Sequence, residues 1–264
     1  LWEREHFYER QLNYIMGQGW YFGIMFVMAI YNLFIYFSLR DRNYLLYTIF
    51  VAAAGLFVAT LNGFSFQYLW PNAPAINQKI LPVSICILAF TGTAFSVGLL
   101  QIRQLHPRLY RLHQIYYAIY CATLLACLLT PYHIAIKLSV LSVVLGAISG
   151  CCVGVYMALP GERTARLYVL SWGVLLLSVI FVVLNKAGIM ASGLISGYSL
   201  QVGSVLEVLL LSFALANRIN EEREAKEIAQ EEALKKEQQL REGQERYLQL
   251  EYNARMEELH ARQK

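Results

Sequence analysis

The first 217 residues alternate between long apolar runs and short polar breaks, and the rest of the chain is polar. A helix needs about 20 apolar residues to cross the hydrocarbon core of a bilayer, and seven stretches reach that length. The pattern predicts an all-α, polytopic membrane protein, a seven-transmembrane helix bundle. The predicted spans cover approximately residues 19–39, 44–64, 80–102, 109–130, 134–159, 165–185 and 198–216.

Residues 218–264 contain no proline and one glycine, and they are rich in residues that favour helix. The seventh run continues into this segment without a breaker, so we expect one long helix of which this part extends roughly 70 Å. A heptad seam is visible, but the positions of a second seam are mostly polar, which predicts a weak coiled coil. Two interpretations stay open, a solvated single helix and a parallel dimeric signalling helix. The seam residues are Ile219, Ala233, Leu240, Tyr247 and Ala254.

The amino-acid composition supports a division into an apolar first part and a polar tail. The chain is 57% hydrophobic and 15% charged, against roughly 45–50% and 25% in soluble proteins. These values exclude a disordered chain or a nucleic-acid-binding domain and argue against a soluble enzyme. Residues 1–217 carry 12 Lys or Arg and 6 Asp or Glu, whereas residues 218–264 carry 10 and 12. The first part therefore suits lipid and the second suits water.

Lys and Arg in short loops predict the orientation of the spans. The first, third and fifth loops hold seven of them, and the second, fourth and sixth hold one each. We therefore expect an N-terminus outside and a C-terminus in the cytoplasm, in a bacterial inner membrane. The first loop also contains Asp41. The arginines of the first and third loops are Arg40, Arg42, Arg103, Arg108 and Arg111.

The expected signatures of several membrane chemistries are missing. The seventh span has no lysine for a retinal Schiff base, and the chain has no His-Glu-x-x-His and no Gly-x-Ser-x-Gly motif. We therefore predict no catalytic residue, no cofactor and no metal site in this segment. The five cysteines lie inside apolar runs and are interpreted as small buried hydrophobic residues.

Glu207 is the clearest carboxylate inside a predicted span. A charge at that depth costs at least about 2.5–3.5 kcal/mol, so the group must be neutral, paired or in a wet cavity. Gln201, Ser204 and Glu207 recur every three residues and form one polar stripe toward the bundle interior. Asn32 lies at a similar depth on the first span, which would allow its amide to donate to Glu207. A structural hydrogen bond and a switch or ligand contact both remain open.

Three segments resemble one bacterial family, the seven-transmembrane receptors with diverse intracellular signalling modules. They are Tyr31 to Tyr47 (YNLFIYFSLRDRNYLLY), Gln67 to Pro71 (QYLWP) and Leu206 to Ile219 (LEVLLLSFALANRI). The resemblance covers about residues 14–220. It would place Asp where this chain has Asn217.

The resemblance implies an extracytoplasmic ligand-binding domain before the first span and a cytoplasmic output domain after the tail. Histidine kinase is slightly favoured for that output over diguanylate cyclase. The chain begins at Leu1 rather than Met, so we expect a piece of a longer protein. Its parts would be an extracytoplasmic linker at 1–13, a sensor domain at 14–217 and a signalling helix at 218–264.

We therefore expect a signal-transduction receptor core that relays an outer signal through the seventh span to a coiled coil. Its partners would be the lipid bilayer, a second copy through the C-terminal helix, and the two missing domains, with no nucleic acid. The alternatives are a transporter or channel that uses Glu207, and a passive membrane anchor for a dimeric output domain.

Overall fold

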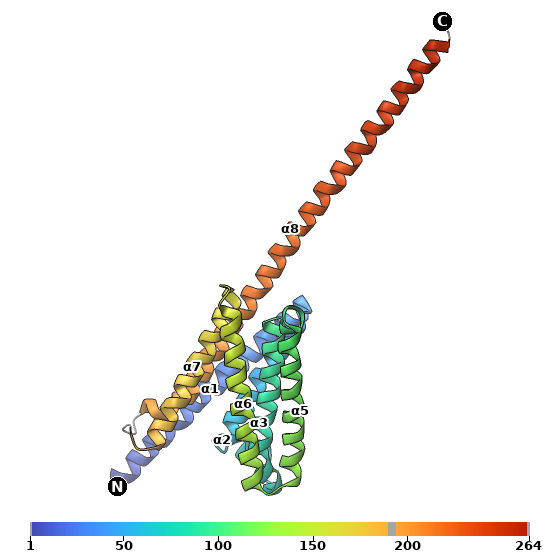
Figure 1. Cartoon of the computed structure of the whole chain (residues 1–264). Helices are drawn as coiled ribbons and strands as arrows, with labels where there is room; N and C mark the ends of the chain where they lie inside the picture. Colours follow the sequence, from blue (N-terminus) through green and yellow to red (C-terminus); the bar gives the residue numbers. More distant parts are fainter. Residues whose placement is uncertain (1, 190–193, 263–264) are drawn as a thin grey trace. The chain divides into compact units, whose positions relative to one another are not determined.

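A computed structural model of the chain describes residues 2–189 and 194–262. The described residues form helices joined by short turns, with no β-strand among them (Figure 1). The helices are α1 (Trp2–Leu39), α2 (Arg42–Leu61), α3 (Pro74–Leu99), α4 (Ile102–Leu105), α5 (Pro107–Leu129), α6 (Tyr132–Ala158), α7 (Arg163–Lys186) and α8 (Leu194–Arg262), with a π-helical turn η1 (Ser65–Leu69).

Seven of the described helices are long and apolar enough to cross a membrane, which confirms the predicted fold class. The spans are Gln11–Leu39, Arg42–Leu61, Pro74–Leu99, Pro107–Leu129, Tyr132–Ala158, Arg163–Asn185 and the apolar part of Tyr198–Gln249. Many large apolar side chains of α6 and α7, such as Leu141, Ile148 and Leu177, are exposed. In a helix that faces lipid, such side chains meet hydrocarbon instead of water.

The chain divides into two compact units, Leu1–Asn217 and Arg218–Lys264. In the first unit, α2 packs against α1 and α3, and α3, α5 and α6 pack side by side. Helix α7 packs on α6 (Figure 1). Below, the bundle means the first unit and the tail means the second.

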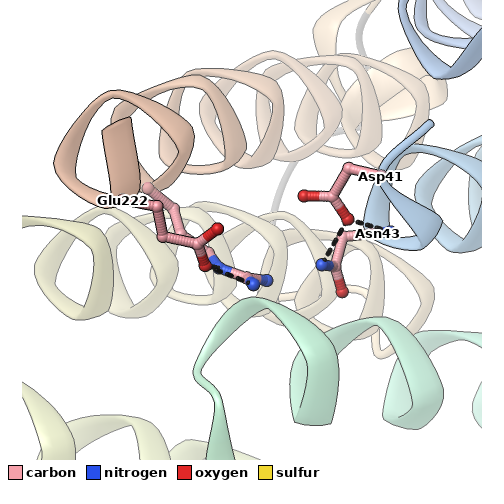
Figure 2. A network of polar contacts seen from close by, with 4 residues as sticks. Asp41, Asn43 and Glu222 are labelled. Carbon is pink, nitrogen blue, oxygen red and sulfur yellow. Dashed lines mark hydrogen bonds and ion pairs between the residues drawn. The ribbon is translucent and has the colours of Figure 1, made fainter. Parts of the chain in front are cut away.

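Local signals in the sequence set the helix ends. Arg40 adopts a left-handed conformation with φ of 58° and ends α1. Asp41 then caps α2, because its Oδ1 accepts hydrogen bonds from the backbone N and the Nδ2 of Asn43 at 2.8 and 2.7 Å (Figure 2). Proline begins both α3 and α5, where a missing N–H costs nothing.

The first helix begins at Trp2, so the segment 1–13 is helical over its described residues, and its expected role as a linker stays a prediction. One predicted span end was wrong. The third span ends at Leu99 rather than 102, because Gln101 has a left-handed φ of 50° and the chain turns into the short helix α4. The prediction extended the span through this turn, because the composition of a segment does not reveal its backbone dihedral angles.

Candidate functional site

The predicted polar stripe of α8 lies inside the bundle. Gln201, Ser204 and Glu207 are all buried, and Glu207 is 4% exposed. Their spacing of three residues places them on one face of the helix, the face that is turned away from lipid. Burial of three polar residues on a span is costly unless each finds partners, so their contacts decide what this face does.

Helix α8 is bound to α1 and α2 close to Glu207. The Ser204 hydroxyl lies 3.3 Å from the Tyr21 hydroxyl of α1, and the Tyr47 hydroxyl of α2 donates to the backbone oxygen of Val208. Tyr47 and Val208 are almost completely buried. A neutral buried hydrogen bond contributes about 1 kcal/mol, so these two contacts position α8 at the level of its carboxyl group.

Two further hydrogen bonds connect α8 to other parts of the bundle, one on each side of Glu207 along the helix. Tyr198 donates from its hydroxyl to the backbone oxygen of Asn13 at 3.3 Å, and the Asn217 amide donates to the Thr164 hydroxyl of α7 at 3.0 Å. Asn217, where the resemblance would place Asp, thus supplies a donor that an ionised Asp would lack.

The expected hydrogen bond from Asn32 to Glu207 is absent. The Asn32 amide nitrogen donates instead to the backbone oxygen of Met28, four residues earlier on the same helix, at 2.8 Å. A short polar side chain on a helix can reach the carbonyl one turn back, and this local bond competes with any partner on another helix. Asn32 is fully buried, and its Oδ1 has no hydrogen-bond partner among the described residues.

Glu207 lines a cavity of about 290 Å³ inside the bundle. All spanning helices except α1 contribute to its wall, and on α7 the lining runs from Tyr168 to Val179. The eleven helical steps between these two residues correspond to about 16 Å along the helix axis. The Glu207 carboxyl makes no hydrogen bond or ion pair with any residue in the described part of the chain. The sequence predicted the buried carboxyl but not the cavity.

Tyrosines on α5 and α7 fill the hollows left by the glycines of α6. A Cβ on Gly146 would collide with the Tyr120 hydroxyl, and one on Gly154 would lie 2.7 Å from the Tyr168 ring. Tyr168 is 1% exposed, and its hydroxyl donates to the Ser96 hydroxyl of α3 at 3.1 Å. Gly146, Gly150 and Gly154 recur every four residues on α6, and the first and last of them serve helix packing within this chain.

The predicted loop residues lie at the surface. The five arginines are exposed, and Asp41 is partly buried as the α2 cap. The guanidinium carbon of Arg103 lies 5.8 Å from the centre of the Tyr110 ring, within the range of a cation–π contact. The arginines are Arg40, Arg42, Arg103, Arg108 and Arg111.

In the tail, the seam positions Ala233, Leu240 and Tyr247 are exposed, and Ile219 lies in its first turn. The side chain of Ala254 is outside the described residues. Arg218 and Glu222 form an i, i+4 ion pair at 2.7 Å, with the Glu222 side chain seen in Figure 2.

The cysteines were expected to be buried, and this is correct for two of the five. Cys86 and Cys127 are buried, Cys151 is intermediate, and Cys121 and Cys152 are exposed on helices that face lipid. Both buried thiols contact the Ser139 hydroxyl, at 3.5 and 3.1 Å. All five are free, and the described residues contain no group of three metal-ligating side chains.

A family model described as 7TM diverse intracellular signalling matches residues 14–218. The match covers the bundle almost completely and ends at the first residue of the tail. No curated protein and no solved structure matches the chain.

Proposed function

The chain belongs to the 7TM diverse intracellular signalling family, and from this premise we propose that its bundle relays an extracytoplasmic signal through α8 to a cytoplasmic output domain. It is a multi-pass membrane protein and a signalling receptor of that family. The proposal concerns the route of the signal, its direction and the type of output.

The proposal rests on one observation, the continuity of helix α8. One helix, Leu194–Arg262, contains both the buried polar stripe and the tail. Its first part is held by hydrogen bonds with α1, α2 and α7, and so a rearrangement of those helices would change its position or rotation. A continuous helix transmits such a movement along its axis, since its backbone hydrogen bonds resist bending.

We propose that the tail forms a parallel dimer. Ala233, Leu240 and Tyr247 repeat every seven residues and are exposed in the single chain, as are Leu234 and Leu248 next to them. Attachment to a membrane raises the effective concentration of two tails, which favours association of a weak coiled coil. Low stability suits a relay, because a small free energy from a ligand then shifts the dimer between two geometries.

The proposed orientation follows from the loop charges, which put the C-terminus in the cytoplasm of a bacterial cell. A histidine kinase is the output we favour, followed by diguanylate cyclase. In either case the bundle supplies no catalytic residue, and the reaction would take place in the domain that receives the helix.

Insertions that rotate the end of the tail helix about its axis distinguish a relay from a passive anchor. The chain would be fused after Lys264 to a histidine kinase core and assayed in membranes. Two residues inserted after Gly243 rotate the following helix by about 200°, whereas seven residues restore its phase to within about 20°. A relay predicts altered basal kinase activity with two residues and nearly parental activity with seven.

Equal activity of both insertion variants and the parent would contradict the relay and indicate a passive anchor. A second variant, Glu207→Gln, asks whether the polar stripe participates. We expect shifted basal output at normal expression, and unchanged basal and stimulated output would leave Glu207 with a structural role. Ion or solute flux that depends on Glu207 in liposomes would instead indicate a transporter.

A further inference from the structure

We propose that the cavity in the bundle is a binding site for a small amphipathic amine, whose ammonium group pairs with Glu207 while its apolar body lies among the aromatic rings. The inference does not rest on the proposed signalling function, because binding can be measured on this chain directly. Three features of the cavity lead to it: its open polar groups, its charge and its size.

The first feature is a carboxyl group that no described residue pairs with. Several hydroxyls of the lining already have acceptors inside the protein: Ser96 donates to the backbone oxygen of Gly92 at 2.8 Å and Tyr168 donates to Ser96. Tyr116 donates to the backbone oxygen of Leu145 at 3.3 Å. The Glu207 carboxyl remains without a partner among the described residues, so the ligand must bring the donor.

His113 supplies a second acceptor. Its Nδ1 lies 2.8 Å from the backbone oxygen of Leu109, and a carbonyl oxygen can only accept, so Nδ1 carries a proton. In the neutral ring, Nε2 is then an acceptor. His113 is buried and lines the same cavity as Glu207. A primary ammonium group offers three N–H donors, which suits acceptors such as the Glu207 carboxylate and the Nε2 of His113.

The second feature is the sign of the charge. The lining contains one carboxyl group, Glu207, and no lysine or arginine. An ionised carboxylate in an apolar cavity is stable only with a counter-charge, and a cationic ligand provides one. The rings of Phe50, Phe57 and Trp172 also line the cavity, and aromatic faces stabilise a cation that has left water.

The third feature is size. A cavity of 150 Å³ accommodates benzene, so 290 Å³ leaves space for a ring and a short chain, or about 12 non-hydrogen atoms on the same scale. An aryl-alkyl amine has this volume. A phospholipid acyl chain is longer, and an inorganic cation would leave most of the apolar wall without a contact.

The test uses phenylbutylamine and its uncharged isostere phenylbutanol on the chain in lipid nanodiscs, with empty nanodiscs to subtract partitioning into lipid. Tritiated ligands and a scintillation proximity assay give both affinities. We expect the amine to bind about tenfold or more tighter than the alcohol, because only the amine can pair with Glu207.

Two matched pairs of variants locate the site. Glu207→Gln should abolish the preference for the amine, whereas Glu222→Gln removes the same charge in the tail and should preserve it. Ala147→Phe fills the cavity from α6 and should abolish binding of both ligands. Ile148→Phe, at the neighbouring exposed position, should bind like the parent chain.

Absence of saturable binding of either ligand to the folded parent chain would overturn the inference. Equal binding of amine and alcohol, or a preference for the amine that survives Glu207→Gln, would also overturn it. Should Ala147→Phe fail to fold, Glu207→Gln with the two ligands still decides the outcome, because that substitution keeps the size of the side chain.

Discussion

The bundle and the tail are both helical, yet different forces hold their helices in place. In the bundle, glycines admit tyrosine rings and buried hydroxyls find specific partners, as for Gly154 with Tyr168 and Tyr168 with Ser96. The tail has 22 charged residues among 47, and its described side chains beyond the first turns are exposed. The bundle geometry is therefore fixed by side-chain fit, and the tail is helical through backbone propensity and surface charge pairs.

This difference bears on how the proposed relay would work. Side-chain fit gives a bundle a small number of discrete packings, because well-packed interfaces do not deform continuously. A polar helix with a weak seam holds its partner less firmly than a coiled coil with two apolar seams. In the proposed relay the tail would follow the packing that the bundle adopts, and we expect substitutions to have opposite consequences in the two regions.

The largest expected effect is at a bundle glycine. Gly154→Ala places a methyl group 2.7 Å from the Tyr168 ring, and overpacking of this kind costs about 1–3 kcal/mol. Gly173→Ala is the control, because nothing lies within 4 Å of its Cβ position on α7. Unfolding in mixed detergent micelles should show a clearly lower free energy of unfolding for Gly154→Ala and no decrease for Gly173→Ala. Equal stability of the two variants would refute the packing role of Tyr168.

The next effect concerns the hydrogen bond between α7 and α3. Tyr168→Phe removes the donor to Ser96 and should lower the free energy of unfolding by about 1 kcal/mol. Ser96→Ala removes the other partner, and the double variant should lose less than the sum of the two single variants. Strict additivity in the same unfolding assay would mean that the two hydroxyls do not interact.

Substitution of the tail glycine should have the opposite effect on stability. Nothing lies within 4 Å of the Cβ position of Gly243, so Gly243→Ala should stabilise the helix by about 0.8–1.0 kcal/mol. Circular dichroism should show equal or greater helix content in the tail on heating, with bundle unfolding unchanged. A decrease in helix content would show that an unseen contact requires the glycine.

The smallest effect is at the ion pair of Arg218 and Glu222, with 11% and 32% of their side chains exposed. Glu222→Gln should cost about 0.3–0.5 kcal/mol at low salt. Because salt screens partly exposed charges, the difference from the parent chain should shrink as sodium chloride is raised. A loss that persists in high salt would point to a role for Glu222 beyond this pair.

The sequence predicted the spans well, since a membrane helix is defined by length and composition, which are properties of a local window. It also predicted that Gln201, Ser204 and Glu207 share a buried face, because helical periodicity is local too. The end of the third span was missed at Gln101, where a backbone dihedral angle rather than an apolar residue decides the turn.

Partners of buried groups were harder to predict than their burial. Asn32 was expected to meet Glu207 on another helix, but Met28 one turn away supplies the nearer acceptor. Tyr120 and Tyr168 were missed as the residues that fit the glycines of α6, because which helices become neighbours depends on the whole bundle. For the same reason the cavity at Glu207 carries no local sequence signal.

The central claim is that the tail is a parallel dimeric relay, and disulfide crosslinking in membranes tests it most directly. Single cysteines would replace Ala233, Leu240 and Tyr247 on the seam, and Gln238 and Glu245 on the opposite face, in a chain without its five native cysteines. The account predicts strong crosslinked dimers at the three seam positions and weak ones at the two controls. Equal crosslinking at all five positions, or none with folded protein present, would contradict the account.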